Sequence, residues 1–168
     1  MGEEIVNKVE QSGLITINLE DYYEKGDRVL IDIQSQLFQG MILREKEFRE
    51  YIKNENWESF KDKFVAITCS TDAIIPTWAY MLLAIHLQPF AKKIVFGTLE
   101  QLEADIFREK LKNISLENFR DARVVIKGCS NLPVPTSAYL ELTALLRPIA
   151  KSIMYGEPCS TVPLFKRK

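Results

Sequence analysis

A chain of 168 residues with 46% hydrophobic and 27% charged residues is typical of one globular domain that needs neither disulfides nor a metal to hold its core. Its formal net charge is -1, and its only basic cluster is Lys166-Arg167-Lys168 at the C-terminus, so we expect no nucleic-acid binding. The most apolar segment, residues 78–87, is about half as long as a membrane-spanning helix, so we expect no membrane insertion. Without signal-peptide character at its start, the chain is expected to be cytoplasmic, with three free thiols.

The N-terminal region predicts a short helix and then two strands. Residues 3–11 have the spacing of an amphipathic helix. Residues 14–19 and 29–33 alternate apolar and polar side chains, which is the period of strands with one solvent-facing side. Because a turn signal, Lys25-Gly26-Asp27, separates them, the pattern predicts a β-hairpin that forms an antiparallel edge of the sheet.

From residue 36 onward, helical and strand patterns alternate. The expected helices span 36–54, 77–88, 99–113 and 136–147, and the expected strands span 64–68, 93–96, 123–127 and 152–155. Strands that alternate with helices require right-handed crossovers. The fold class expected is therefore α/β, with a mainly parallel sheet and helices on both faces.

Much of the chain is repeated. Displaced by 59 positions, residues 48–97 align without a gap with residues 107–156 and share 21 identities in 50 positions, where chance gives about three. The pattern indicates an internal duplication within a single domain. We divide residues 1–168 into an N-terminal hairpin extension (1–40), a first repeat (41–97), a second repeat (98–156) and an extended tail (157–168).

The two repeated helices differ in polarity. The first has Leu82, Ala84 and Gln88 where the second has two charged residues and a threonine, so the first helix lacks a solvent-facing side. We expect such a helix to be covered on both sides. Either the N-terminal hairpin covers it, or a second copy of the chain does so in a homodimer.

Three cysteines follow predicted strands. Cys69, Cys129 and Cys159 each lie within four residues of a strand end, and the carboxyl ends of parallel strands share the edge of a sheet where ligands bind. Three thiolates there would suit Zn²⁺ with a fourth ligand, or an iron–sulfur cluster with one open position. Their spacing matches no metal-binding signature. Two other interpretations stay open: inert thiols at tight strand exits, and reactive thiols that carry sulfur.

The loops before the repeated helices are candidates for cofactor binding. Their polar side chains stand beside unpaired N–H groups at a helix N-terminus, which is a general arrangement for anions. The candidate residues are Ser70, Thr71, Asp72, Ser130, Asn131 and Thr136. Neither loop has the glycines of a phosphate-binding loop, which disfavours nucleotides, and helix capping is the alternative role. The single histidine, His86, gives little support to hydrolysis by a Ser-His or Cys-His pair.

Four runs of the chain resemble segments of a bacterial family of domains of unknown function: LREKEFREYIKN, VAITCSTDAIIPTWAYMLLA, VVIKGCSNLPVPTSAYLELT and KSIMYGEPCSTVP. The resemblance covers nearly the whole chain and implies no established activity. It implies an association with iron–sulfur cluster assembly genes, whose products are then candidate partners. We therefore expect a cytoplasmic metal or iron–sulfur accessory or carrier protein. An interaction or dimerisation module and a thiol enzyme of sulfur transfer are the alternatives.

Overall fold

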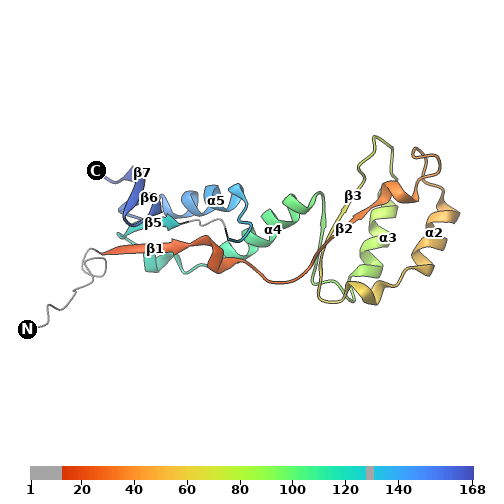
Figure 1. Ribbon diagram of the computed structural model, residues 1–168, viewed down its shortest axis with the longest axis horizontal. Helices are drawn as coiled ribbons and strands as arrows, with labels where there is room; N and C mark the ends of the chain where they lie inside the picture. The colour runs from red at the N-terminus through yellow and green to blue at the C-terminus, as the bar shows by residue number, and fades with distance from the viewer. Residues whose placement is uncertain (1–12, 128–130) are drawn as a thin grey trace, which may run out of the picture. The chain divides into compact units, whose positions relative to one another are not determined.

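The computed structural model describes residues 13–127 and 131–168, so the helix expected at 3–11 lies outside the described residues. The chain forms two compact units. We call Lys25–Asp105 the inserted unit, and the described residues up to Glu24 together with those from Ile106 onward the flanking unit. Each unit has its own sheet and its own hydrophobic core (Figure 1). The α/β class is confirmed, but the expectation of a single sheet is wrong.

The inserted unit contains a parallel sheet in the order β2-β3-β4, formed by β2 (Arg28–Asp32), β3 (Phe64–Thr68) and β4 (Lys93–Phe96). The central strand β3 is a continuous run of apolar residues because both its faces are buried. Two helices, α2 (Glu45–Asn54) and α3 (Thr77–Leu87), pack on one face. Their core residues there include Phe48, Ile52, Leu83 and Leu87, which meet Val65 and Ile67 of β3.

A third helix, α4 (Leu99–Lys112), contributes residues to both units. In the inserted unit its Glu103 accepts two hydrogen bonds from the guanidinium of Arg28, at 2.8 and 2.9 Å, and its Asp105 pairs with Lys93 at 2.8 Å. Arg28 and Lys93 are in register with Phe64, so they belong to the face opposite Val65. Helices therefore lie on both faces of this sheet, as the alternation of strands and helices predicts.

The flanking unit contains a sheet in the order β1-β5-β6-β7, formed by β1 (Leu14–Asn18), β5 (Arg123–Lys127), β6 (Ser152–Glu157) and β7 (Ser160–Lys166). The first three strands are parallel, and β7 runs antiparallel to β6. The helix α5 (Thr136–Leu146) and the second half of α4 share one core with this sheet. Among its buried residues are Phe107, Leu111, Ile126, Leu142 and Ile153.

The predicted N-terminal hairpin is wrong, although both of its strands form. β1 pairs with β5 and β2 pairs with β3, each in parallel, because pairing with a buried strand hides more apolar surface than an isolated hairpin does. The glycine of the turn signal Lys25-Gly26-Asp27 is required for a different reason. A Cβ on Gly26 would lie 2.8 Å from the ring of Phe64, so the glycine permits a close approach to β3. The antiparallel edge is instead β7, in the segment expected only to be extended.

The helix expected over 36–54 begins only at Glu45. Gln39 and Gly40 have positive φ values of 52° and 69°, which an α-helix does not allow. Gly40, which weakens the helical pattern in the sequence, thus marks a region where no helix forms.

Corresponding elements of the two units are separated by a constant number of residues. The first residues of β5, α5 and β6 each lie 59 positions after those of β3, α3 and β4. Two aspartates with left-handed backbone, Asp62 (φ 60°) and Asp121 (φ 55°), obey the same spacing. The offset of the sequence repeat is therefore also the offset of the secondary structure.

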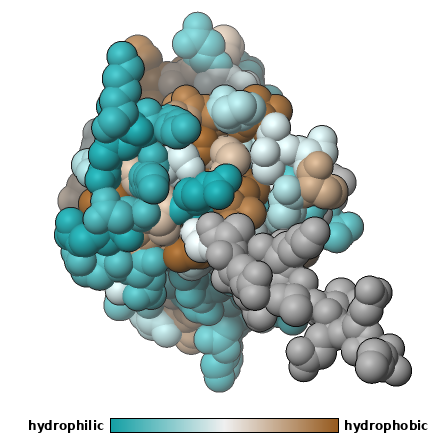
Figure 2. Space-filling model, turned by 90° about the vertical axis from the view of Figure 1, so that its left-hand side faces the viewer, coloured by the Kyte–Doolittle hydropathy of each residue, from teal (hydrophilic) through white to brown (hydrophobic). Residues whose placement is uncertain are grey.

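The surface of the flanking unit is mixed in polarity. Figure 2 looks onto the left-hand side of Figure 1, where hydrophilic side chains cover much of the face and apolar ones lie between them. On β7, Val162 and Leu164 are among the exposed apolar side chains. None of the helices within residues 13–127 and 131–168 combines the length and the hydrophobicity of a membrane-spanning helix.

Candidate functional site at the carboxyl ends of the strands

Asp32, the last residue of β2, ties two loops to the carboxyl edge of the inserted sheet. Its Oδ1 accepts hydrogen bonds from the backbone N–H groups of Gln34 at 3.0 Å and Ser70 at 3.1 Å. Partial burial raises the pKa of Asp32, but hydrogen bonds from the Ser70 side chain and from these two amides outweigh it and hold the pKa below the ordinary value of 3.8. The carboxylate is therefore a fixed negative charge at neutral pH.

Cys69 and Tyr80 lie at the same edge. Cys69 follows β3, is half-buried, and donates its thiol hydrogen to the carbonyl oxygen of Thr71 at 3.5 Å. Burial raises the pKa of Tyr80 above 10.0, and electrostatic interactions with the neighbouring Cys69 and Asp32 raise it further. Tyr80 thus stays protonated and can donate a hydrogen bond to an anionic neighbour. The edge gathers a thiol, a carboxylate and a phenol.

The flanking unit has a similar edge, but its carboxylate belongs to Glu20, two residues after the end of β1. Its strand β1 ends in Asn18, whose Oδ1 accepts the N–H of Glu20 at 3.1 Å. The Oε1 atom of Glu20 accepts the N–H groups of Asn131 at 3.0 Å and Leu132 at 3.2 Å. In both units a carboxylate at the end of the first strand or just after it accepts hydrogen bonds from the loop that leads to the repeated helix, α3 or α5.

An aromatic pair accompanies each edge. Tyr80 packs edge-on against Phe96, with ring centroids 5.2 Å apart, and Tyr139 packs in the same way against Tyr155 at 5.8 Å. In each pair a tyrosine from the first turn of a helix meets the end of a parallel strand. Packing therefore accounts for both tyrosine rings, and the hydroxyl of Tyr80 additionally lies within the electrostatic reach of Cys69.

The loops expected to bind an anion donate backbone hydrogen bonds to two carboxylates of the chain itself, those of Asp32 and Glu20. Ser70 gives its backbone N–H to Asp32, and Asn131 gives its N–H to Glu20. The Ser70 hydroxyl, which acts on the Asp32 carboxylate, also lies 2.5 Å from the side-chain oxygen of Gln34. These backbone amides are thus already satisfied. Of the other residues expected in this role, Thr71 is half-buried, Asp72 and Thr136 are exposed, and Ser130 lies outside the described residues.

The cysteines expected to converge occupy different kinds of position. Cys69 is half-buried in the inserted unit, and Cys159 is exposed in the turn between β6 and β7 of the flanking unit. Cys129 lies outside the described residues. Within residues 13–127 and 131–168, no three His, Cys, Asp or Glu side chains are grouped to hold a metal ion. A shared three-thiol site stays a prediction.

The apolar helix α3 has an exposed side. Met81 is 59% exposed and Ile85 is 66% exposed, whereas Leu83 and Leu87 face the core. The expected cover by an N-terminal hairpin is therefore wrong, because β1 pairs with β5 and β2 with β3, so these two strands form no hairpin. Cover by a second copy of the chain stays a prediction.

Three polar residues of these edges were missed by the sequence analysis: Glu20, Asp32 and Gln34. A signal for them exists. Each of the first two strands ends in an Asx residue, Asn18 or Asp32, followed two positions later by Glu20 or Gln34. The two patterns lie 14 positions apart, outside the aligned repeat, so a comparison at an offset of 59 cannot reveal them.

A family model described as a protein of unknown function (DUF2480) matches residues 3–167. No curated protein and no solved structure matches the chain significantly. The resemblance drawn from the sequence runs is therefore confirmed at the level of the family.

Proposed function

The chain belongs to the DUF2480 family of unknown function, and we propose that it is a thiol-dependent accessory or carrier protein of soft-metal or iron–sulfur metabolism. The observation that carries this proposal is the half-buried Cys69 thiol at the carboxyl edge of a parallel sheet. Ligands of parallel α/β sheets bind at that edge. The implied association with iron–sulfur assembly genes points in the same direction and makes their products the candidate partners.

The side chains around Cys69 suit a thiolate ligand. A bound Zn²⁺ or iron–sulfur cluster would supply a soft, positively charged centre that stabilises deprotonated sulfur. Tyr80 would remain protonated beside it and donate a hydrogen bond, which is how outer-shell groups tune metal-bound sulfur. Asp32 would keep the loop in place through the amide of Ser70. Cys129 and Cys159 are the further ligands in this proposal.

A duplication explains why there are two such edges. The sequence repeat and the elements of the two units share the offset of 59 positions, and each unit begins with its own parallel strand. We infer that one ancestral strand–helix–strand unit was copied and that the whole chain, residues 1–168, works as one domain. The inserted edge kept a cysteine directly after its strand, whereas Gly128 stands at the aligned position.

The test is metal analysis of protein purified without oxygen. Wild-type protein should carry metal or show the visible absorption of a cluster, before or after reconstitution with Zn²⁺ or with iron and sulfide. Cys69→Ala should weaken metal binding by about tenfold or more, because one charged ligand is lost. Ser160→Ala, an exposed neighbour of Cys159, is the matched control and should bind as the wild type does.

Two results would refute the metal site. One is wild-type protein that takes up no metal under any of these conditions. The other is a triple Cys→Ala variant whose thermal stability responds to added metal as the wild type does. If the metal-free protein instead shows one thiol that is alkylated far faster than the others, sulfur transfer by that thiol replaces the proposal.

A second candidate function is a non-catalytic interaction module, and the exposed side of α3 favours it. Met81 and Ile85 are neighbours one turn apart on the helix, and both are more than half exposed. A homodimer through this stripe would give a sedimentation coefficient that rises with protein concentration. Met81→Lys should abolish that rise, and a wild type that sediments as a monomer at all concentrations would contradict the dimer.

A further inference from the structure

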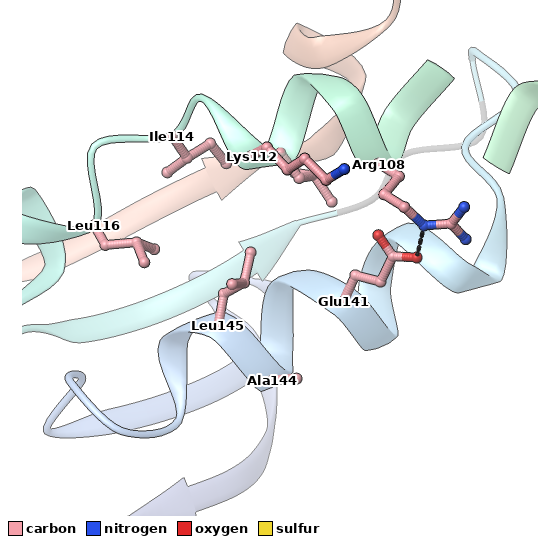
Figure 3. A pocket seen from close by; sticks show the side chains of 8 residues that line it. Arg108, Lys112, Ile114, Leu116, Glu141, Ala144 and Leu145 are labelled. Carbon is pink, nitrogen blue, oxygen red and sulfur yellow. Dashed lines mark hydrogen bonds and ion pairs between the residues drawn. The ribbon is translucent and has the colours of Figure 1, made fainter. Parts of the chain in front are cut away.

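A hollow of about 500 Å³ lies in the flanking unit between the end of α4 and α5 (Figure 3). Its floor is apolar and includes Ile114, Leu116 and Leu145, while Arg108 and Glu141 stand at one end and are paired at 3.0 Å. The volume falls in the range of about 300 to 1,000 Å³ that is usual for small-molecule sites. No thiol of the proposed metal site lines it.

The corresponding place in the inserted unit is filled by the chain's own rings. At the offset of 59 positions, Leu116 and Leu145 correspond to Trp57 and His86. The indole of Trp57 is buried, lies 5.5 Å from the ring of His86, and donates its N–H to the carbonyl of Ile52 at 2.8 Å. The flanking unit thus keeps the helices and strands of the inserted unit but has two leucines where the latter has two rings.

Charge distinguishes the two ends of the hollow. The polar end holds two cations, Arg108 and Lys112, against one carboxylate, Glu141. Arg108 is engaged with Glu141, whereas Lys112 forms no ion pair among the described residues. Figure 3 shows the Lys112 side chain running along the rim toward Arg108. A ligand with one negative charge would balance this end, while its apolar part contacts the leucines.

We propose that the hollow binds a small amphipathic anion whose flat apolar body occupies the place that the Trp57 ring fills in the inserted unit. A carboxylate or sulfonate at the end of that body pairs with Lys112. The apolar body gains binding energy from burial against Ile114, Leu116 and Leu145, and the charge fixes its orientation.

The test uses the full chain and two fluorescent probes of similar shape. One is the anion 8-anilinonaphthalene-1-sulfonate, and the other is the uncharged N-phenyl-1-naphthylamine. Both should bind the wild type at one site. Leu116→Trp places an indole where the inserted unit has one and should weaken both probes by about tenfold or more. Lys112→Glu should weaken the sulfonate by a similar factor and leave the uncharged probe within about twofold.

Matched variants keep the result interpretable. Leu140→Trp, on the exposed side of α5 and outside the hollow, is the control for an added indole. Lys151 is exposed elsewhere in the flanking unit, so Lys151→Glu is the control for the change of charge in Lys112→Glu. Ala144→Ile fills the hollow from α5 and serves if Leu116→Trp fails to fold. Near-ultraviolet circular dichroism confirms that each variant is folded.

Three outcomes would overturn the proposal. The wild type binds neither probe, or a folded Leu116→Trp or Ala144→Ile variant binds both as tightly as the wild type does. The third outcome is that Lys112→Glu weakens both probes equally, which contradicts recognition of the negative charge. Because no cysteine lines the hollow, these results are independent of the metal analysis.

Discussion

A single carboxylate at each sheet edge holds a loop by its backbone amides. Asp32 does so in the inserted unit through Gln34 and Ser70, and Glu20 does so in the flanking unit through Asn131 and Leu132. Hydrogen bonds to an ionised acceptor are about twice as strong as neutral ones. These residues therefore position the loops that carry the polar side chains and Cys69, and they do not themselves need a ligand.

Replacing Asp32 with Asn should change how stability depends on pH. Because the folded-state pKa of Asp32 is below its ordinary value of 3.8, the carboxylate stabilises the folded state above that pH, and this contribution is lost as the pH falls through the folded-state pKa. The wild type should therefore be more stable than Asp32→Asn at about pH 7, with a smaller difference below about pH 4. Urea unfolding at both pH values measures the difference.

Asp72→Asn is the control for this experiment, because Asp72 is exposed in the same loop as Ser70. Its effect on the free energy of unfolding should be within about 0.5 kcal/mol at either pH. A stability difference between the wild type and Asp32→Asn that is the same in acid and at neutral pH would show that the Asp32 charge does not stabilise the loop.

At the scale of elements, the sequence predicted the regular core segments well and the segments at the chain's periphery poorly. The buried strands β3 and β5 and the helices α3 and α5 have strong local patterns and form at nearly the expected residues. Pairing partners are not a local property. The alternation in β1 and β2 specifies strands but not their neighbours, so a turn signal between them led to the wrong hairpin.

The strand β7 was missed for a related reason. Pro158 and Pro163 suggest an irregular tail, but proline is tolerated in an edge strand, and β7 is paired only on one side, with β6. A register shift lies between Ile153 and Met154, the latter being the partner of Pro163. The missing N–H of a proline thus falls where the regular ladder is interrupted.

Phe165→Ala should show that β7 is part of the flanking core. The Phe165 ring packs against that core on one side, and the guanidinium of Arg147 lies 3.8 Å from its centroid. The substitution should lower the free energy of unfolding by about 1–3 kcal/mol, less than for a fully buried phenylalanine, because the ring is half-buried. Leu164→Ala, at the exposed neighbouring position, should cost no more than about 0.5 kcal/mol. Equal losses in urea unfolding would contradict this role.

At the scale of the whole chain, the order of the elements explains why the division into two units could not be predicted from the sequence. The strand β1 and its partner β5 are separated by the entire inserted unit, so the flanking unit is discontinuous in sequence. The aligned repeats, residues 48–97 and 107–156, do not include the first strands of the two units, which lie 14 positions apart. The same holds for the candidate site. The strand pattern predicted the position of Cys69 at the sheet edge, but it did not predict Asp32, because β2 lies outside the aligned repeats.

Each unit has a separate core cluster, so a cavity in one core should loosen that unit first. Leu83 and Leu142 are matched residues, 59 positions apart, and both are fully buried. Leu83→Ala and Leu142→Ala should each destabilise the protein by about 2–5 kcal/mol. In hydrogen exchange followed by mass spectrometry, Leu83→Ala should speed exchange mainly in β2, β3 and β4, and Leu142→Ala mainly in β1, β5 and β6, because local unfolding follows cooperative units. If both substitutions speed exchange to the same extent in all six strands, the two clusters unfold together, and the division into two units has no counterpart in stability.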